Sequence, residues 1–165
     1  MFTLSTLCGL FGAYSAACLL HEIGHFVAAR LFGIRVDRLF LFHDAGGLAL
    51  VRWTSGGTVF GIGWLPTGAY ISLSGMDPVH SSPTDRIRFR SRAPGVRLFV
   101  LAAGVLANFM TAAGCLVVAW WVGDAVPLFV IALAVVSLVL GLVNLIPAPG
   151  TDGYLILRIL RSRGR

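Results

Sequence analysis

The sequence has no lysine and little charge of either sign, since charged residues make up 12% of its 165 residues. Hydrophobic residues make up 57%, whereas an average soluble domain is about 45–50% apolar and about 25% charged. This shortage of charge excludes an ordinary soluble domain. We therefore expect a membrane protein of mainly α-helical class.

Cysteine is also scarce. Cys8, Cys18 and Cys115 show neither a CxxC pair nor a Cys/His spacing typical of a metal site or a disulfide framework. All three fall in apolar runs, and we interpret them as small apolar side chains in helix packing.

Three apolar runs have the length needed to cross a bilayer, about 20 residues each: residues 2–32, 96–122 and 126–147. The first run lacks the positively charged start of a secretory signal and is longer than the apolar part of one, so we expect it to be retained. The sequence has no internal repeat, and the roughly 20 residues after Gly75 are too few to form a second core. Residues 1–165 are expected to form one domain.

All 13 basic residues are arginines, and they lie in residues 30–52, 86–97 and 158–165. The turn between the second and third apolar runs carries only Asp124. Under the positive-inside rule, this distribution places the N-terminus outside and the C-terminus in the cytoplasm. The net charge of +6 is thus a topology signal with a secondary attraction to anionic lipid headgroups. Nucleic acid is not an expected partner.

Residues 46–75 are rich in glycine, threonine, aromatic and β-branched residues. Gly56 and Gly57 separate two apolar stretches, which predicts a β-hairpin followed by an irregular, glycine-punctuated loop. The segment is expected to lie partly in the membrane, where non-helical backbone must be covered by protein or line a wet cavity. After Pro147 and Pro149, the sequence DGYLILRILRSRGR predicts a short C-terminal helix along the cytoplasmic interface.

The first apolar run contains ionisable residues, in LLHEIGHFVAAR at residues 19–30. His21 and His25 are four residues apart, so on a helix they project from one face. Glu22 completes an HExxH motif, in which two histidines bind zinc and the glutamate accepts a proton from water. Ionisable groups within a span are costly and mark function. We therefore predict a zinc site rather than three polar residues satisfied by neighbouring helices.

A catalytic zinc site needs a third protein ligand and an open position for water. Asp152 is favoured because it follows the break after the third apolar run, although it is also suited to cap the last helix. His43 is the next choice. The other candidates are less favoured. Asp124 lies on the far side of the bilayer, and the rest lie in connecting segments, where they can be solvated: Asp37, Asp44, Asp77, His80 and Asp85. His21 lies roughly 14 Å from Arg30 along the helix, so the site is expected inside the bilayer, nearer the cytoplasmic face.

Four sequence blocks together resemble the site-2 proteases, a family of intramembrane zinc metalloproteases. They are HEIGH in the first span, GAYISLSG in the membrane-associated loop, AGVLANF in the second span and NLIPAPGTDG at the end of the third. The resemblance implies that His21, His25 and Asp152 bind one Zn²⁺ per chain and that Glu22 is the catalytic base. It also implies a bacterial cell membrane protein. The depth of His21 in the first span independently predicts that water reaches the active site from the cytoplasmic side.

The chain departs from the family pattern at two positions. Thr151 stands where the family usually has leucine, and Val105 where it usually has proline. Neither is a ligand position, so the departures concern local backbone geometry. Many bacterial members also carry a PDZ domain before the second span, which does not fit this length, and we expect a minimal catalytic core.

Further residues are predicted to contact the substrate. Asn144, eight residues before Asp152, is the best candidate to hold the developing oxyanion, with interhelical hydrogen bonding as an equal alternative. Asn108 is interpreted as a packing and hydrogen-bonding residue, with substrate contact as a lesser alternative. The hairpin and loop, including Gly68 and Tyr70, are predicted to offer backbone partners to an unwound substrate strand, or alternatively to plug the site.

These features predict an intramembrane zinc endopeptidase that cuts single-span membrane proteins within or near their transmembrane segments. By resemblance, it releases regulatory fragments such as anti-sigma factors or clears remnant signal peptides. The alternative is a catalytically inactive membrane protein with the same fold that binds helices, against which the presence of Glu22 argues. A metal transporter would need ligands on both sides of the bilayer, and the outer half has almost none. The oligomeric state does not follow from the sequence.

Overall fold

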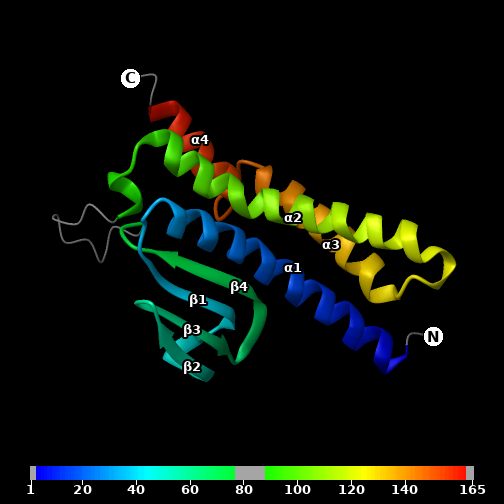
Figure 1. The fold of residues 1–165 in the computed structure, drawn as a ribbon. Helices are drawn as coiled ribbons and strands as arrows, with labels where there is room; N and C mark the ends of the chain where they lie inside the picture. Colours follow the sequence, from blue (N-terminus) through cyan, green and yellow to red (C-terminus); the bar gives the residue numbers. More distant parts are fainter. Residues whose placement is uncertain (1–2, 77–87, 163–165) are drawn as a thin grey trace.

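The structure of the protein, a computed structural model, describes residues 3–76 and 88–162 (Figure 1). Three long helices lie side by side, namely α1 (Leu4–Leu31), α2 (Pro94–Val122) and α3 (Leu128–Leu145). Each is long and apolar enough to cross a membrane. Each also agrees with one of the predicted runs to within two residues. A short 3₁₀ turn, η4 (Gly123–Ala125), joins α2 to α3.

Small side chains let α1 and α2 approach each other closely. A Cβ atom added to Gly24 would lie 2.5 Å from the carbonyl oxygen of Ala103 and 2.8 Å from the Cβ of Ala107. Close backbone approach of this kind is how apolar helices gain van der Waals contact with each other. Gly24 therefore sets the spacing between α2 and the helix that carries both motif histidines.

A four-stranded sheet lies along the C-terminal half of α1 (Figure 1). The strand order is β2-β3-β1-β4, for β1 (Val36–His43), β2 (Ala49–Ser55), β3 (Thr58–Gly63) and β4 (Leu65–Leu73). β1 is parallel to β3 and antiparallel to β4. β2 and β3 form the predicted hairpin, which turns at Gly56 and Gly57 with φ of 55° and 77°. Two positive φ angles are what a type I′ hairpin turn requires, so this prediction is confirmed.

The prediction of an irregular loop after the hairpin is wrong, because those residues form strand β4. Pro66 and Gly68 interrupt the apolar pattern there, but β4 is an edge strand, where a residue without an N–H is tolerated. β1 is not predicted by the sequence pattern either. Asp37 and Arg38 break the apolar alternation at its start, so that this stretch resembles a connecting segment.

The predicted C-terminal helix is present as α4 (Asp152–Ser162). It lies beside the start of α2 (Figure 1), and its Ile159 belongs to a buried cluster with Phe89, Val100 and Leu101. The same cluster includes residues at the end of α1 and the start of β1. This core holds α4, and with it Asp152, against α1 and α2.

Candidate metal centre

His21, His25 and Asp152 come together in space. The two histidines lie one turn apart on α1 and are 7% and 5% exposed, while Asp152 is the first residue of α4. The Oδ2 atom of Asp152 lies 3.0 Å from Nε2 of His21 and 3.2 Å from Nε2 of His25. The two Nε2 atoms are 3.1 Å apart.

A backbone carbonyl orients His25. Its Nδ1 lies 2.8 Å from the carbonyl oxygen of Val100 on α2. Because a carbonyl can only accept, Nδ1 carries the hydrogen and donates it, which leaves the lone pair of the neutral ring on Nε2. That lone pair faces Asp152. Metal-binding histidines are typically held from behind in this way.

Asn108 occupies the equivalent place behind His21. It is fully buried on α2, and its amide nitrogen lies 3.2 Å from Nδ1 of His21. In that orientation its Oδ1 is buried without a hydrogen-bond partner, which costs about 1–3 kcal/mol. Rotating the amide by 180° lets Oδ1 accept the Nδ1 hydrogen of His21. The Nε2 lone pair of His21 then also faces Asp152.

Asn108 is predicted from the sequence to be a packing and hydrogen-bonding residue, but the sequence does not reveal that its partner is the predicted ligand His21. The available signal was the spacing of Gly104 and Asn108, which places both on the face of α2 that meets the histidines. A Cβ atom added to Gly104 would lie 2.6 Å from Cε1 of His25 and 2.8 Å from Cε1 of His21. Glycine at this position therefore leaves room for both imidazole rings.

Thr151, the residue before Asp152, caps α4, which leaves the side chain of Asp152 free to face the histidines. Thr151 Oγ1 accepts a hydrogen bond from the backbone N–H of Tyr154 at 3.3 Å, which is the capping role left open for Asp152. Thr151 is also a position where the chain departs from the family pattern. The carboxylate of Asp152 is therefore free of the capping role and lies against the two histidines.

These three donors fit a single metal ion. Their ligand atoms all lie within 4.8 Å of one another, and they are the one such group among the described residues. Tetrahedral zinc, with ligand distances of about 2.0–2.1 Å, holds neighbouring donor atoms about 3.3 Å apart. The separations here, 3.0 to 3.2 Å, are close to that value. Two lone pairs and a carboxylate oxygen at such distances favour a cation between them.

Glu22 shares a cavity of about 280 Å³ with the three donors. The cavity is lined from α1, β4, α2, α4 and the end of α3. The carboxylate of Glu22 accepts a hydrogen bond from the backbone N–H of Ile71 on β4. The edge strand therefore positions Glu22 beside the histidines, although Glu22 is not one of the three donors.

A family model described as Peptidase family M50 matches residues 12–126 of the sequence. The chain belongs to peptidase family M50. This confirms the predicted membership of the site-2 proteases. The matched residues include the HEIGH motif and Asn108, and they end before Asp152.

Several M50 relatives are similar to the chain over part of their length. A protein of Chlamydia trachomatis named as a zinc metalloprotease is 38% identical over 106 residues, covering 57% of this chain and 16% of the relative. One of Synechocystis, similarly named, is 34% identical over 102 residues, covering 61% and 27%. The regulator of sigma E protease of Haemophilus influenzae is 37% identical over 103 residues, covering 62% and 22%. The chain therefore covers far less than half of each relative.

The other candidate ligands of this M50 chain have different partners. His43 is the last residue of β1. Its Nδ1 atom lies 3.0 Å from the hydroxyl oxygen of Thr67, and its ring stacks on the ring of Tyr70. Asp37 forms an ion pair with Arg35 at 3.0 Å. Neither belongs to the metal-binding group. Asp77, His80 and Asp85 lie outside the described residues.

Asp44 and Tyr70 form a polar network on the sheet. Asp44 Oδ2 pairs with Arg38 at 3.3 Å and Arg52 at 3.4 Å. Its Oδ1 accepts a hydrogen bond of 2.6 Å from the hydroxyl of Tyr70. Burial, and then this hydrogen bond, raises the pKa of Tyr70. Tyr70 also lines the cavity of the metal centre, so the network supports one wall of it.

Two further predicted site residues occupy different surroundings. Asn144 lines the cavity, and its amide donates to the carbonyl of Leu140 one turn back in α3 at 3.1 Å; the amide nitrogen carries a second hydrogen. Gly68 has a φ of 109° and faces α1, since an added Cβ would lie 3.5 Å from Oη of Tyr14 and 3.8 Å from Sγ of Cys18. The contacts of Asn144, Gly68 and Tyr70 with a substrate stay predictions.

Proposed function

We propose that this chain is an intramembrane zinc endopeptidase, which hydrolyses peptide bonds within or near transmembrane segments. One observation carries the proposal. The two buried histidines of an HExxH motif, on a helix of membrane-spanning length, face a carboxylate from the distant α4, and the motif glutamate shares their cavity. Ligands, a base and space for a peptide are what zinc-assisted hydrolysis requires. The names of the relatives support this activity.

His21, His25 and Asp152 are the proposed ligands of one Zn²⁺ per chain. Bound zinc supplies Lewis-acid chemistry, since it acidifies water and polarises the scissile carbonyl. Val100 and Asn108 hold the imidazoles with their lone pairs inward. The chain thus presents both histidines in the neutral form that a metal ion requires.

Glu22 is the proposed general base. Its carboxylate takes a proton from the attacking water and later returns it to the leaving amine. The N–H of Ile71 holds the carboxylate in the cavity, while the amide of Asn144 is proposed to donate to the oxyanion. These residues surround the same space from α1, β4 and α3, so that base and oxyanion donor act on one peptide bond.

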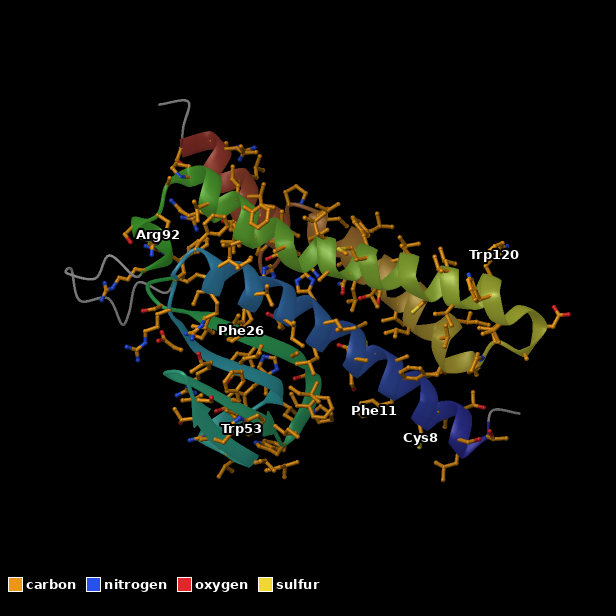
Figure 2. The ribbon with its side chains drawn as sticks, in the orientation of Figure 1. Cys8, Phe11, Phe26, Trp53, Arg92 and Trp120 are labelled. Atoms are coloured by element: carbon orange, nitrogen blue, oxygen red, sulfur yellow. The ribbon has the colours of Figure 1, made fainter. Side chains whose placement is uncertain are left out.

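The three long helices are proposed to cross the bacterial cell membrane with the N-terminus outside and the C-terminus and active-site opening in the cytoplasm. Arg92 and Trp120 mark opposite ends of the bundle (Figure 2). Trp120 and Trp121 are 81% and 79% exposed. Exposed tryptophans are typical of a membrane–water interface, and clustered arginines of the cytoplasmic side. Both ends of the bundle therefore suit this orientation.

Single-span membrane proteins are the proposed substrates, and β4 is their proposed docking strand. A helical peptide bond must unwind before hydrolysis because its carbonyl is already bonded. β4 is an edge strand whose Ile71 N–H is directed at Glu22, so its outer edge faces the cavity. A substrate strand added there gains backbone hydrogen bonds in place of its helical ones. A plug over the site is the alternative role of β4.

Exchange of Glu22 for glutamine tests the endopeptidase against an inactive helix-binding protein of the same fold. Zinc-loaded wild-type protein and Glu22→Gln are compared on a panel of single-span membrane proteins, with zinc content measured in parallel. The variant should keep zinc and lose at least about 100-fold in cleavage rate, because an amide cannot accept the proton. Equal cleavage by both proteins would remove Glu22 as the base. Binding without cleavage by the zinc-loaded wild type would favour the inactive protein.

A further inference from the structure

A second cavity, of about 330 Å³, lies at the arginine-bearing end of the molecule. Three arginines from three separate segments line it: Arg90 of the short 3₁₀ helix η3 (Phe89–Ser91), Arg97 of α2 and Arg158 of α4. Apolar side chains complete the lining, among them Phe89 and Ile159, each 4% exposed. The cavity thus combines converging positive charge with an apolar floor.

Nothing in the described part of the chain neutralises this charge. No carboxylate from those residues lines the cavity, and their arginine–aspartate ion pairs lie on the sheet and the turn before it. Arg97 lies over the ring of Phe89 at 5.3 Å, and its Nε is buried without a hydrogen-bond partner. Arg158 lies over the ring of Tyr154 at 5.8 Å. Converging like charges and an unpaired N–H are both relieved by an anion.

The position of the cavity favours a lipid as the source of that anion. It lies where α4 meets the start of α2, at the end of the bundle that the proposed membrane orientation places at the cytoplasmic interface. Basic pockets between helices on that side bind anionic headgroups, and arginine pairs with phosphate through two parallel hydrogen bonds. The cytoplasmic flank of a single-span substrate is itself rich in basic residues, so this cavity would repel it.

We propose that Arg90, Arg97 and Arg158 bind the phosphate of an anionic phospholipid headgroup. The apolar floor contacts the glycerol and the first methylene groups of the lipid. The cavity shares Met76 and Leu155 with the cavity of the metal centre. A bound lipid therefore lies next to the candidate active site without entering it, and it joins η3 and α2 to the helix that begins with Asp152.

Lipid titration of the full chain in neutral detergent tests this site. Phosphatidylglycerol, phosphatidylcholine and inorganic phosphate are added separately, and binding is followed by the Tm of the protein. Phosphatidylglycerol should raise the Tm saturably, whereas the other two should not. Arg158→Gln should weaken the apparent affinity for phosphatidylglycerol about fivefold, as expected for one arginine near an anionic surface. Arg97→Gln should weaken it at least as much.

Arg161→Gln is the matched control, because Arg161 is exposed on the same helix and does not line the cavity. It should leave the affinity unchanged. Equal weakening by Arg158→Gln and Arg161→Gln would overturn the proposal in favour of diffuse attraction. Equal stabilisation by inorganic phosphate would overturn the assignment to a lipid. The readout involves neither zinc nor cleavage, so its failure is distinguishable from failure of the proposed function.

Discussion

Asp44, which directly follows β1, and Asp152 at the metal centre are two aspartates with similar burial and different partners. Their side chains are 10% and 12% exposed, and each lies within 3.4 Å of two nitrogen-bearing side chains. Arginines surround Asp44, and their permanent charge neutralises it. Histidines surround Asp152, and hydrogen bonds at Nδ1 turn the Nε2 lone pairs toward it.

This difference separates a structural carboxylate from a candidate ligand. Arginine has no lone pair to offer a metal ion, so the Asp44 group is complete as it stands. Two neutral imidazoles and a carboxylate lack a positive charge, which a cation supplies. Burial alone therefore does not distinguish the two regions, whereas the chemistry of the partners does.

The largest expected effect is a loss of zinc affinity when the charge of Asp152 is removed, and the same change at Asp44 is the matched control. Asp152→Asn should weaken zinc affinity by more than about 100-fold, beyond the range seen for residues that only support a ligand. Asp44→Asn should leave the zinc affinity unchanged, because its partners lie on the sheet. Competition with a chelator measures both. Full zinc occupancy in Asp152→Asn would contradict the assignment of Asp152 and favour His43 as the third ligand.

A smaller effect is expected from the residue behind His21. Asn108→Ala removes the acceptor for Nδ1 and should weaken zinc affinity by about 10- to 100-fold, the usual cost of losing such a partner. Asn144→Ala is the matched control, since Asn144 bonds to Leu140 in its own helix. It should lower kcat through the oxyanion and leave zinc affinity unchanged. Similar zinc affinities in the two variants would contradict the positioning role of Asn108.

The smallest effect is expected in the Asp44 network. Tyr70→Phe removes one hydrogen bond and should lower the free energy of unfolding by about 1 kcal/mol. Because burial and Asp44 raise the pKa of Tyr70 above its usual value of 10, the folded state retains the phenol proton longer than the unfolded state does. This stabilisation is complete below pH 10 and is lost as the pH rises through the higher folded-state pKa.

Thermal unfolding in detergent measures that pH dependence. Above about pH 10, the Tm of the wild type should fall more steeply than that of Tyr70→Phe. Zinc content serves as the control and should be equal in both proteins. Parallel pH profiles would show that the pKa of Tyr70 is not raised in the folded protein.

Local patterns predicted the elements that depend on near neighbours in the chain. The three long helices follow from continuous apolar runs, and the β2–β3 hairpin follows from Gly56 and Gly57 between apolar stretches. The regularity of β4 could not be predicted in this way. Pro66 and Gly68 disfavour a strand locally, and pairing with β1, a strand distant in sequence, overrides that preference.

The sequence by itself determined the fold class, through its apolar runs, and the M50 family, through its sequence motifs. It also determined the shared face of His21 and His25, because helix periodicity relates residues only four apart. Only the tertiary structure decided which carboxylate faces them and which side chain lies behind His21. The same holds for the convergence of Arg90, Arg97 and Arg158 on one cavity. The physical reason is that these contacts join residues far apart in sequence, whose meeting depends on how α1, α2 and α4 pack around a common core.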